Sequence, residues 1–213
     1  SIGMMINSYT LYSTPLRLRN LGLVMQQWDH QTGFSLVNEA VVMEHRERHA
    51  AYLSDLPSSI HEGERYSNQL SIAIYCYEYG NAYWGQWGPS SLVNGGLGGS
   101  EEAVVFLAEA LVKVYNYDIT VYADPSPHDL MKHSINGVRW RHHSAFDVDR
   151  PEDVFISWRY GASLGLGYKA SRRFLWLQDL VSWESLPTLS VMLNGKNNED
   201  NETIILVLSD FHK

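Results

Sequence analysis

The chain has 213 residues, of which 45% are hydrophobic and 12% aromatic, so it can bury the core of one domain with an appendage. Its formal net charge of −8, without any Lys/Arg run longer than a pair, argues against a nucleic-acid binder, which would carry a basic face. No stretch reaches the roughly 18 apolar residues of a membrane span, no signal-peptide pattern is present, and the single cysteine, Cys76, cannot form an internal disulfide, so we expect a cytoplasmic protein.

A helical hairpin is predicted at the N-terminus. Apolar residues recur at helical spacing over residues 15–53, and Gly33 interrupts the pattern, which favours two helices. Residues 54–68 contain a proline, paired serines, a glycine and several charges but no apolar period, which is typical of a linker. We therefore divide the chain into a helical appendage with a linker, residues 1–69, and a main domain, residues 70–213.

The main domain shows short β-rich runs separated by turns or by a helix, the pattern of an α/β unit with a mainly parallel sheet. The helix is expected over residues 101–114, where apolar residues share one face. We predict an α/β fold, a Rossmann-like three-layer sandwich with about six strands. The strands are expected at residues 70–77, 118–122, 138–141, 153–158, 173–177 and 203–208.

A glycine-rich stretch, GGLGGS at residues 95–100, runs directly into the predicted helix. Glycines let the backbone approach a ligand and adopt positive φ angles. The free N–H groups and the positive end of the helix dipole at a helix N-terminus favour an anion. The stretch therefore predicts a phosphate-binding loop, with a simple chain turn as the alternative.

A dinucleotide-binding oxidoreductase is one interpretation of this loop, with Asp124 after the second strand as the residue that holds a ribose. Two details argue against it. About twenty residues separate the first strand from the glycines, and Glu101 occupies the place of the fingerprint's third glycine. Glu101 and Glu102 also have a simpler explanation, as acidic residues that favour the helix dipole.

Four blocks of sequence together resemble one enzyme family. They are SIAIYCYEYG, GGLGGSEEAVVFLAEALVKVYNYDITVYA, DVFISWRY followed by RRFLWLQDL, and IILVLSDFHK. In this order they are similar to the N-terminal half of the retaining glycosyltransferases built from two facing Rossmann domains, the GT-B type, family 4-like. The resemblance covers residues 70–213.

The resemblance implies transfer of a sugar from a nucleotide-sugar donor, as substrate rather than cofactor, to a glycan, lipid or protein acceptor. It implies no metal. Gly96, Gly98, Gly99 and Ser100 would face the donor diphosphate and stabilise the charge on the leaving nucleotide. The family's second Rossmann domain would follow Lys213, so the resemblance implies that this chain is a fragment with little activity of its own.

Three further residues would act in the cleft. Where the family pattern has a histidine before an aspartate, this chain has Gln178 before Asp179, and an amide can orient a sugar hydroxyl but cannot transfer a proton. Asp179 has the alternative role of a helix N-cap. Arg159, at a strand's carboxyl end, is placed for an anion or an acceptor, with a surface ion pair as the alternative.

The aromatic residues Tyr83, Trp84 and Trp87 lie in a glycine-rich segment, where exposed rings are unfavourable unless they cover something. We predict that these rings form an acceptor-binding wall, because aromatic faces stack on sugars. Packing in the core against the N-terminal helices is the alternative.

Two other patterns are weaker. Asp147-Val148-Asp149 has the Asp-x-Asp form of single-domain, metal-dependent glycosyltransferases, but it precedes a strand, which favours a solvated turn. His142 and His143 lack the spacing of a zinc site and are interpreted as solvated loop residues. A non-catalytic interaction module that uses the helical hairpin and the tryptophan-containing loop at residues 79–92 is a further alternative.

Overall fold

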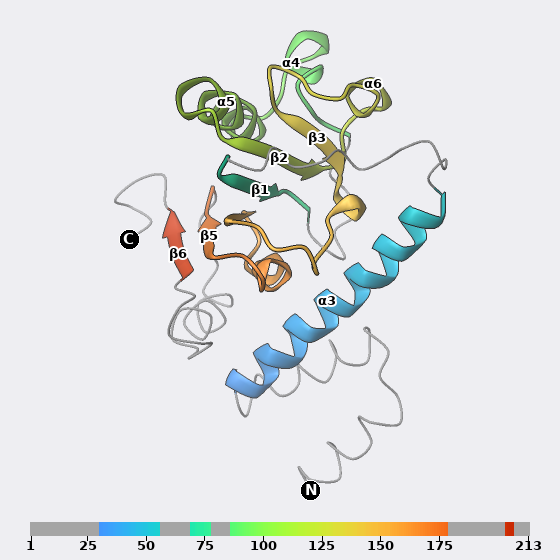
Figure 1. Ribbon diagram of the computed structural model, residues 1–213, viewed down its shortest axis with the longest axis vertical. Coiled ribbons are helices and arrows are strands. Elements are labelled where there is room, and N and C mark those ends of the chain that lie inside the picture. Colours follow the sequence, from blue (N-terminus) through green and yellow to red (C-terminus); the bar gives the residue numbers. More distant parts are fainter. Residues whose placement is uncertain (1–29, 56–68, 78–85, 179–202, 207–213) are drawn as a thin grey trace, which may run out of the picture.

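A six-stranded parallel sheet forms the centre of the computed structural model, which describes residues 30–55, 69–77, 86–178 and 203–206. The strand order is β3-β2-β1-β4-β5-β6, and every pairing is parallel (Figure 1). This confirms the predicted Rossmann-like α/β fold. The strands are β1 (Ser71–Tyr75), β2 (Asp118–Ala123), β3 (Arg139–His142), β4 (Val154–Trp158), β5 (Arg172–Trp176) and β6 (Thr203–Leu206).

Helix α5 (Gly99–Tyr115) follows β1 and covers one face of the sheet, as the apolar pattern predicted. Its buried side chains include Val104, Val105 and Ala108, which pack on apolar residues of β1 and β2. Asn116 ends the helix in the left-handed conformation that suits asparagine at this position. The shorter helical elements are α4 (Ser91–Asn94), α6 (Pro127–Leu130) and the two 3-10 turns η1 (His143–Ala145) and η2 (Gly161–Gly167).

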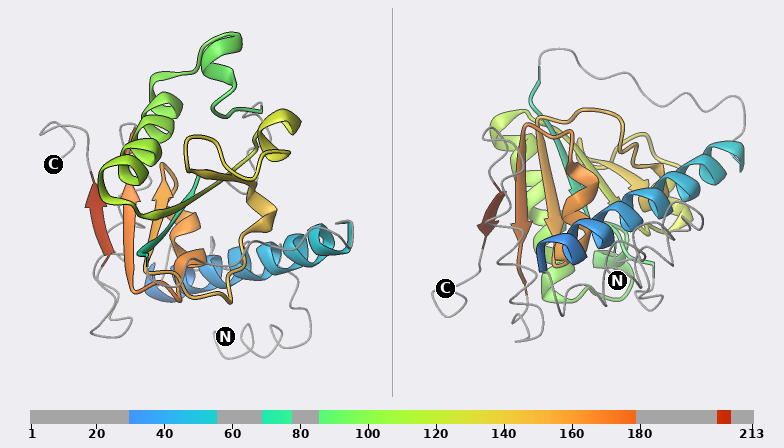
Figure 2. Two further views of the ribbon diagram at one scale, coloured as in Figure 1. Left: turned by 45° about the horizontal axis from the view of Figure 1, so that its top comes forward. Right: turned by 90° about the horizontal axis from the view of Figure 1, so that it is seen from below.

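Helix α3 (His30–Asp55) lies on the opposite side of the sheet from α5 (Figure 2). Val41 of α3 joins a second core with Tyr75, Phe146 and Phe155, whereas Ile74, the neighbour of Tyr75, belongs to the core under α5. This alternation along β1 is the period of two expected for a strand covered on both faces. The three layers are therefore α5, the sheet, and α3 with η1 and η2.

The N-terminal prediction is corrected in one respect. Gly33 does not break the helix, because α3 is continuous from His30 to Asp55. Residues 1–29, where the first helix of the hairpin was expected, and residues 56–68, most of the expected linker, lie outside the described residues. None of the helices in the described part of the chain has the length and apolarity of a membrane-spanning segment.

The strand order determines where a ligand can bind. After β1 the chain builds β2 and β3 on one side, then crosses to build β4, β5 and β6 on the other. The connections on the two sides of β1 therefore leave in opposite directions, which opens a crevice at the carboxyl ends of β1 and β4 in such sheets. The start of α5 and the residue after β4, Arg159, both belong to this edge.

Candidate functional site

Arg159 leaves β4 with an unusual backbone conformation, φ 67°, in the left-handed region. Regular alternation would direct its side chain to the face opposite Trp158. Instead, the guanidinium carbon lies 5.0 Å from the centre of the Trp158 ring, a cation–π contact on the α5 side of the sheet. The Arg159 N–H donates to Trp176 O of β5 at 2.8 Å, which fixes this turn. A strained residue held by its neighbours is typical of functional sites.

The glycine loop connects α4 to α5. Gly96 adopts φ 83°, which favours glycine, and Gly98 is the extended residue before the first turn of α5. A Cβ at Gly96 or Gly99 would meet open space, so these glycines leave the backbone accessible from solvent. At Gly98 a Cβ would collide with Oε2 of Glu101. The backbone at Gly96 and Gly99 is thus open to solvent, whereas the Glu101 carboxylate lies against Gly98.

That carboxylate is almost fully buried, since Glu101 is 6% exposed. The Ser100 hydroxyl donates to Oε2 of Glu101 at 3.0 Å, and Nη1 of Arg159 lies 3.7 Å from Oε1. Nη1 of Arg159 also donates to Ser100 Oγ at 3.5 Å. Burial, together with the nearby charge of Glu101, raises the pKa of the Cys76 thiol well above its ordinary value. The side chains of Ser100 and Glu101 in α5 and of Arg159, the residue after β4, therefore form one polar group at the carboxyl edge of the sheet.

This arrangement can bind an anion. The guanidinium of Arg159, whose side chain is 15% exposed, and the N-terminal N–H groups of α5 are both suited to phosphate oxygens. Glu101 already supplies one negative charge to the same groups. An incoming phosphate must therefore bind beside the ion pair or separate Glu101 from Arg159.

The structure brings together five of the predicted site residues, namely Gly96, Gly98, Gly99, Ser100 and Arg159. Gln178 lies two residues after β5, half-buried, and its Nε2 donates no hydrogen bond to the rest of the described chain. Asp179, Tyr83 and Trp84 lie outside the described residues.

Trp87 is in the core. It is 5% exposed, and its ring lies 5.8 Å from that of Trp140 and 5.6 Å from that of Trp158, measured between ring centres. Its ring is therefore covered by strand residues and presents no face to an acceptor. Core packing is the alternative that the sequence left open, although within the described residues the ring packs on β3 and β4 rather than on α3.

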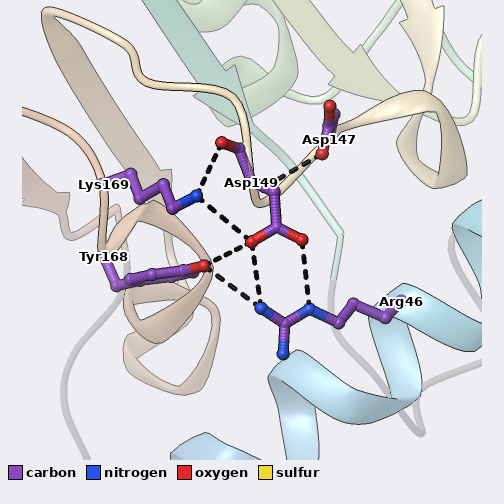
Figure 3. A network of polar contacts seen from close by, with 5 residues as sticks. All are labelled: Arg46, Asp147, Asp149, Tyr168 and Lys169. Atoms are coloured by element: carbon purple, nitrogen blue, oxygen red, sulfur yellow. Dashed lines mark hydrogen bonds and ion pairs between the residues drawn. The ribbon is translucent and has the colours of Figure 1, made fainter.

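The Asp-x-Asp pattern forms part of an attachment for α3 (Figure 3). Asp149 accepts two hydrogen bonds from Arg46 of α3, at 3.0 and 3.3 Å, and one from the Tyr168 hydroxyl at 2.6 Å. Lys169 Nζ lies 3.3 Å from the same carboxylate. These partners, the Arg46 hydrogen bond above all, lower the pKa of Asp149. A carboxylate neutralised by two cations is poorly suited to a metal, and the described residues contain no cluster of three or more His, Cys, Asp or Glu side chains placed to hold one.

His142, which ends β3, and His143, which begins η1, have different environments. His143 is 5% exposed and stacks on Tyr77, with ring centres 3.5 Å apart, so its interpretation as a solvated residue is wrong. Burial first, then the charges of His142 and Arg48, lower its pKa to about 2. His142 is half-buried, and its Nε2 lies 3.7 Å from Asp124 Oδ1 at the end of β2. No local sequence pattern indicates this pair, because the two residues are far apart along the chain and meet only through the β2–β3 register.

Comparisons with protein-family models, with curated proteins and with solved structures found no match to this chain.

Proposed function

We propose that this chain is the acceptor-side Rossmann domain of a retaining glycosyltransferase that uses a nucleotide-sugar donor. One observation carries the proposal. The glycine loop and the α5 N-terminus meet Arg159 at the edge where the strand order reverses, and this is where open α/β sheets bind ligands.

The donor diphosphate would lie against the backbone of Gly96, Gly98 and Gly99, with Ser100 and Arg159 beside it. Negative charge builds up on the diphosphate as the sugar leaves, and fixed N–H groups with a guanidinium stabilise that charge without reorganisation. Exposed glycines allow the close approach that such contacts need. The nucleotide itself would be held by a second Rossmann domain facing this edge.

Gln178 is assigned a positioning role. It follows β5 at the same edge, and its amide has the donor and acceptor needed to orient a sugar hydroxyl. Proton transfer must come from elsewhere, because an amide does not titrate. Asp179, the next residue, keeps its predicted role in the cleft as part of this proposal.

The strand order also supports a second candidate, dinucleotide binding, with Asp124 at the end of β2 on the ribose. The order of the strands is the one found in the dinucleotide-binding fold. However, residues 76–98 separate β1 from α5, whereas the fingerprint turns directly from strand to helix. Glu101 fills the space near Gly98 that the third glycine would leave open.

Binding of nucleoside diphosphates tests the proposal. Isothermal titration with UDP, GDP and ADP is expected to find one ligand whose affinity falls at least about tenfold in Arg159→Gln, a loss of roughly 1.4 kcal/mol. The matched control is Arg150→Gln, which removes an arginine located before β4 instead of after it. No binding of any nucleoside diphosphate would contradict the proposal. Tighter binding of a nicotinamide dinucleotide, lost in Asp124→Ala, would favour the second candidate.

A further inference from the structure

Asp124 follows β2, and His142 ends the neighbouring strand β3. The β2–β3 register pairs Ala123 with His142, so the side chain of Asp124, one residue further on, lies next to the imidazole. The two side chains are 33% and 32% exposed, and both lie at the carboxyl edge that carries the glycine loop. The pair is therefore accessible to a ligand at this edge.

The imidazole of His142 is held in one orientation. The Ser144 N–H donates to its Nδ1 at 3.2 Å, so the ring proton is on Nε2, which faces Asp124 Oδ1 at 3.7 Å. The ring also stacks on Tyr52 of α3, with ring centres 6.2 Å apart and an angle of 11° between the planes. The His143 ring lies beside it, with ring centres 4.1 Å apart. The donor of this pair is thus held by one hydrogen bond and two ring contacts.

His142 is uncharged at neutral pH. Burial lowers the pKa of His142, and the Arg48 charge adds to this effect, while Asp124 opposes it. Neutral His142 then presents one N–H donor, and Asp124 presents carboxylate acceptors. Since 3.7 Å exceeds the 2.7–3.2 Å of a good N–H···O bond, both groups keep capacity for a ligand.

A hydroxyl group is the ligand that fits this donor and acceptor. Its oxygen accepts from an N–H while its proton is donated to a carboxylate, and a polyol offers several such groups. A metal fits less well, because Nδ1 of His142 is already used and a single carboxylate remains. A phosphate would be repelled by Asp124.

The position of the pair links it to the donor loop. The backbone N–H of Trp87 donates to Asp124 O at 3.0 Å. From Trp87 the chain continues through α4 into the glycine loop. Arg159 lies across β1 from Asp124, since β4 and β2 flank β1. A ligand on the pair would therefore share the sheet edge with a donor bound at Arg159.

We propose that Asp124 and His142 form a binding site for a polyhydroxylated acceptor, a sugar or a cyclitol. This pair, rather than the buried Trp87, would then contact the acceptor. That the polyol is an acceptor rests on the proposed function, whereas polyol binding itself does not.

Histidine NMR of the full chain tests this site. The ring C–H signal of His142, identified by its loss in His142→Gln, is followed while methyl α-glucoside, methyl α-mannoside and myo-inositol are added. We expect at least one of these polyols to shift the signal saturably, with a Kd in the millimolar range that suits a few neutral hydrogen bonds. Asp124→Ala should weaken the binding of this polyol at least about tenfold, and the isosteric Asp124→Asn should weaken it about threefold. The reason is that the carboxylate is the strongest partner of the polyol.

Glu109→Gln is the matched control, since Glu109 is a carboxylate on α5 that contacts Asn136 instead of the sheet edge. Its affinity for the polyol should equal that of the wild type. The inference is overturned if none of the three polyols shifts the signal, if Asp124→Ala and Asp124→Asn bind as well as the wild type, or if 1-propanol causes the same shift. Nucleoside diphosphate binding is measured in a separate titration. Failure to bind any nucleoside diphosphate, together with normal polyol binding, would contradict only the proposed function.

Discussion

Nη1 of Arg159 lies 3.7 Å from Oε1 of Glu101, and this ion pair joins the end of β4 to the first turn of α5. Both side chains are largely buried, so the pair is screened less by solvent than a surface pair. It also means that the cation suited to a ligand's phosphate is already next to a carboxylate of the same chain.

The first prediction concerns the competition between Glu101 and a ligand phosphate for Arg159. Glu101→Gln should raise the affinity for the nucleoside diphosphate about fivefold, which corresponds to roughly 1 kcal/mol, because the amide removes the internal negative charge and keeps the shape of the side chain. Isothermal titration measures the effect. Glu102→Gln is the matched control, since it removes a charge from the same helical turn, and it should change the affinity little. Weaker binding in Glu101→Gln would mean that Glu101 orients Arg159 for the ligand.

The second prediction concerns the backbone of Arg159. Arg159→Ala and Arg159→Gly lose the same guanidinium, but the glycine variant should be about 1 kcal/mol more stable, because a left-handed φ is strained in alanine. Urea unfolding measures the difference. At Arg141, which lies in β3 and does not have a positive φ, the order should reverse, with glycine the less stable. Equal stability of the two Arg159 variants would show that the conformation carries no strain.

The third prediction concerns acid. His45 of α3 is fully buried, faces Phe146 O and the Tyr75 hydroxyl, and has a pKa lowered to about 4, mainly by burial. The folded pKa lies below the unfolded value of about 6.5, so the unfolded state binds more protons and stability falls as the pH drops below about 6.5. The loss approaches roughly 1.4 kcal/mol per pH unit for this group until about pH 4.

Urea unfolding at several pH values between neutrality and pH 5 tests this dependence. His45→Gln keeps an N–H donor and should flatten the curve, whereas His133→Gln, at an exposed histidine, should leave it unchanged. An unchanged pH dependence in His45→Gln would assign the acid sensitivity to other groups, such as His143.

The fourth prediction concerns the attachment of α3 in Figure 3. Asp149→Asn should lower the free energy of unfolding by only about 1 kcal/mol, because Arg46 and Asp149 are half-exposed, and this loss should shrink in high salt. Nucleoside diphosphate affinity should stay the same, with or without manganese. A manganese-dependent affinity that disappears in the variant would instead support a metal-dependent transferase at Asp147 and Asp149.

Much of the fold could be predicted from the sequence, because local patterns determine it. The hydrophobic runs at β1 and β2 and the apolar stripe of α5 are visible along the chain. The glycine loop and Arg159 could be expected at one edge, since the carboxyl ends of parallel strands share it. Their direct contact through Ser100 depends on the left-handed turn at Arg159, which no local pattern indicates.

The parts that could not be predicted depend on tertiary packing. Glu101 and His143 are polar residues in polar stretches, and only the folded chain shows that both are buried. Trp87 resembles an exposed ring among glycines until Trp140 and Trp158 are placed around it. The pairing of Asp124 with His142 requires the register between β2 and β3.

The most direct test of the proposed donor site is amide NMR during titration with the nucleoside diphosphate that binds most tightly. We predict that the largest chemical-shift changes occur at Gly96, Gly98, Gly99, Ser100 and Arg159, and that they are lost together in Arg159→Gln. Changes concentrated elsewhere, or unaffected by that substitution, would contradict a diphosphate site at the junction of the glycine loop and β4.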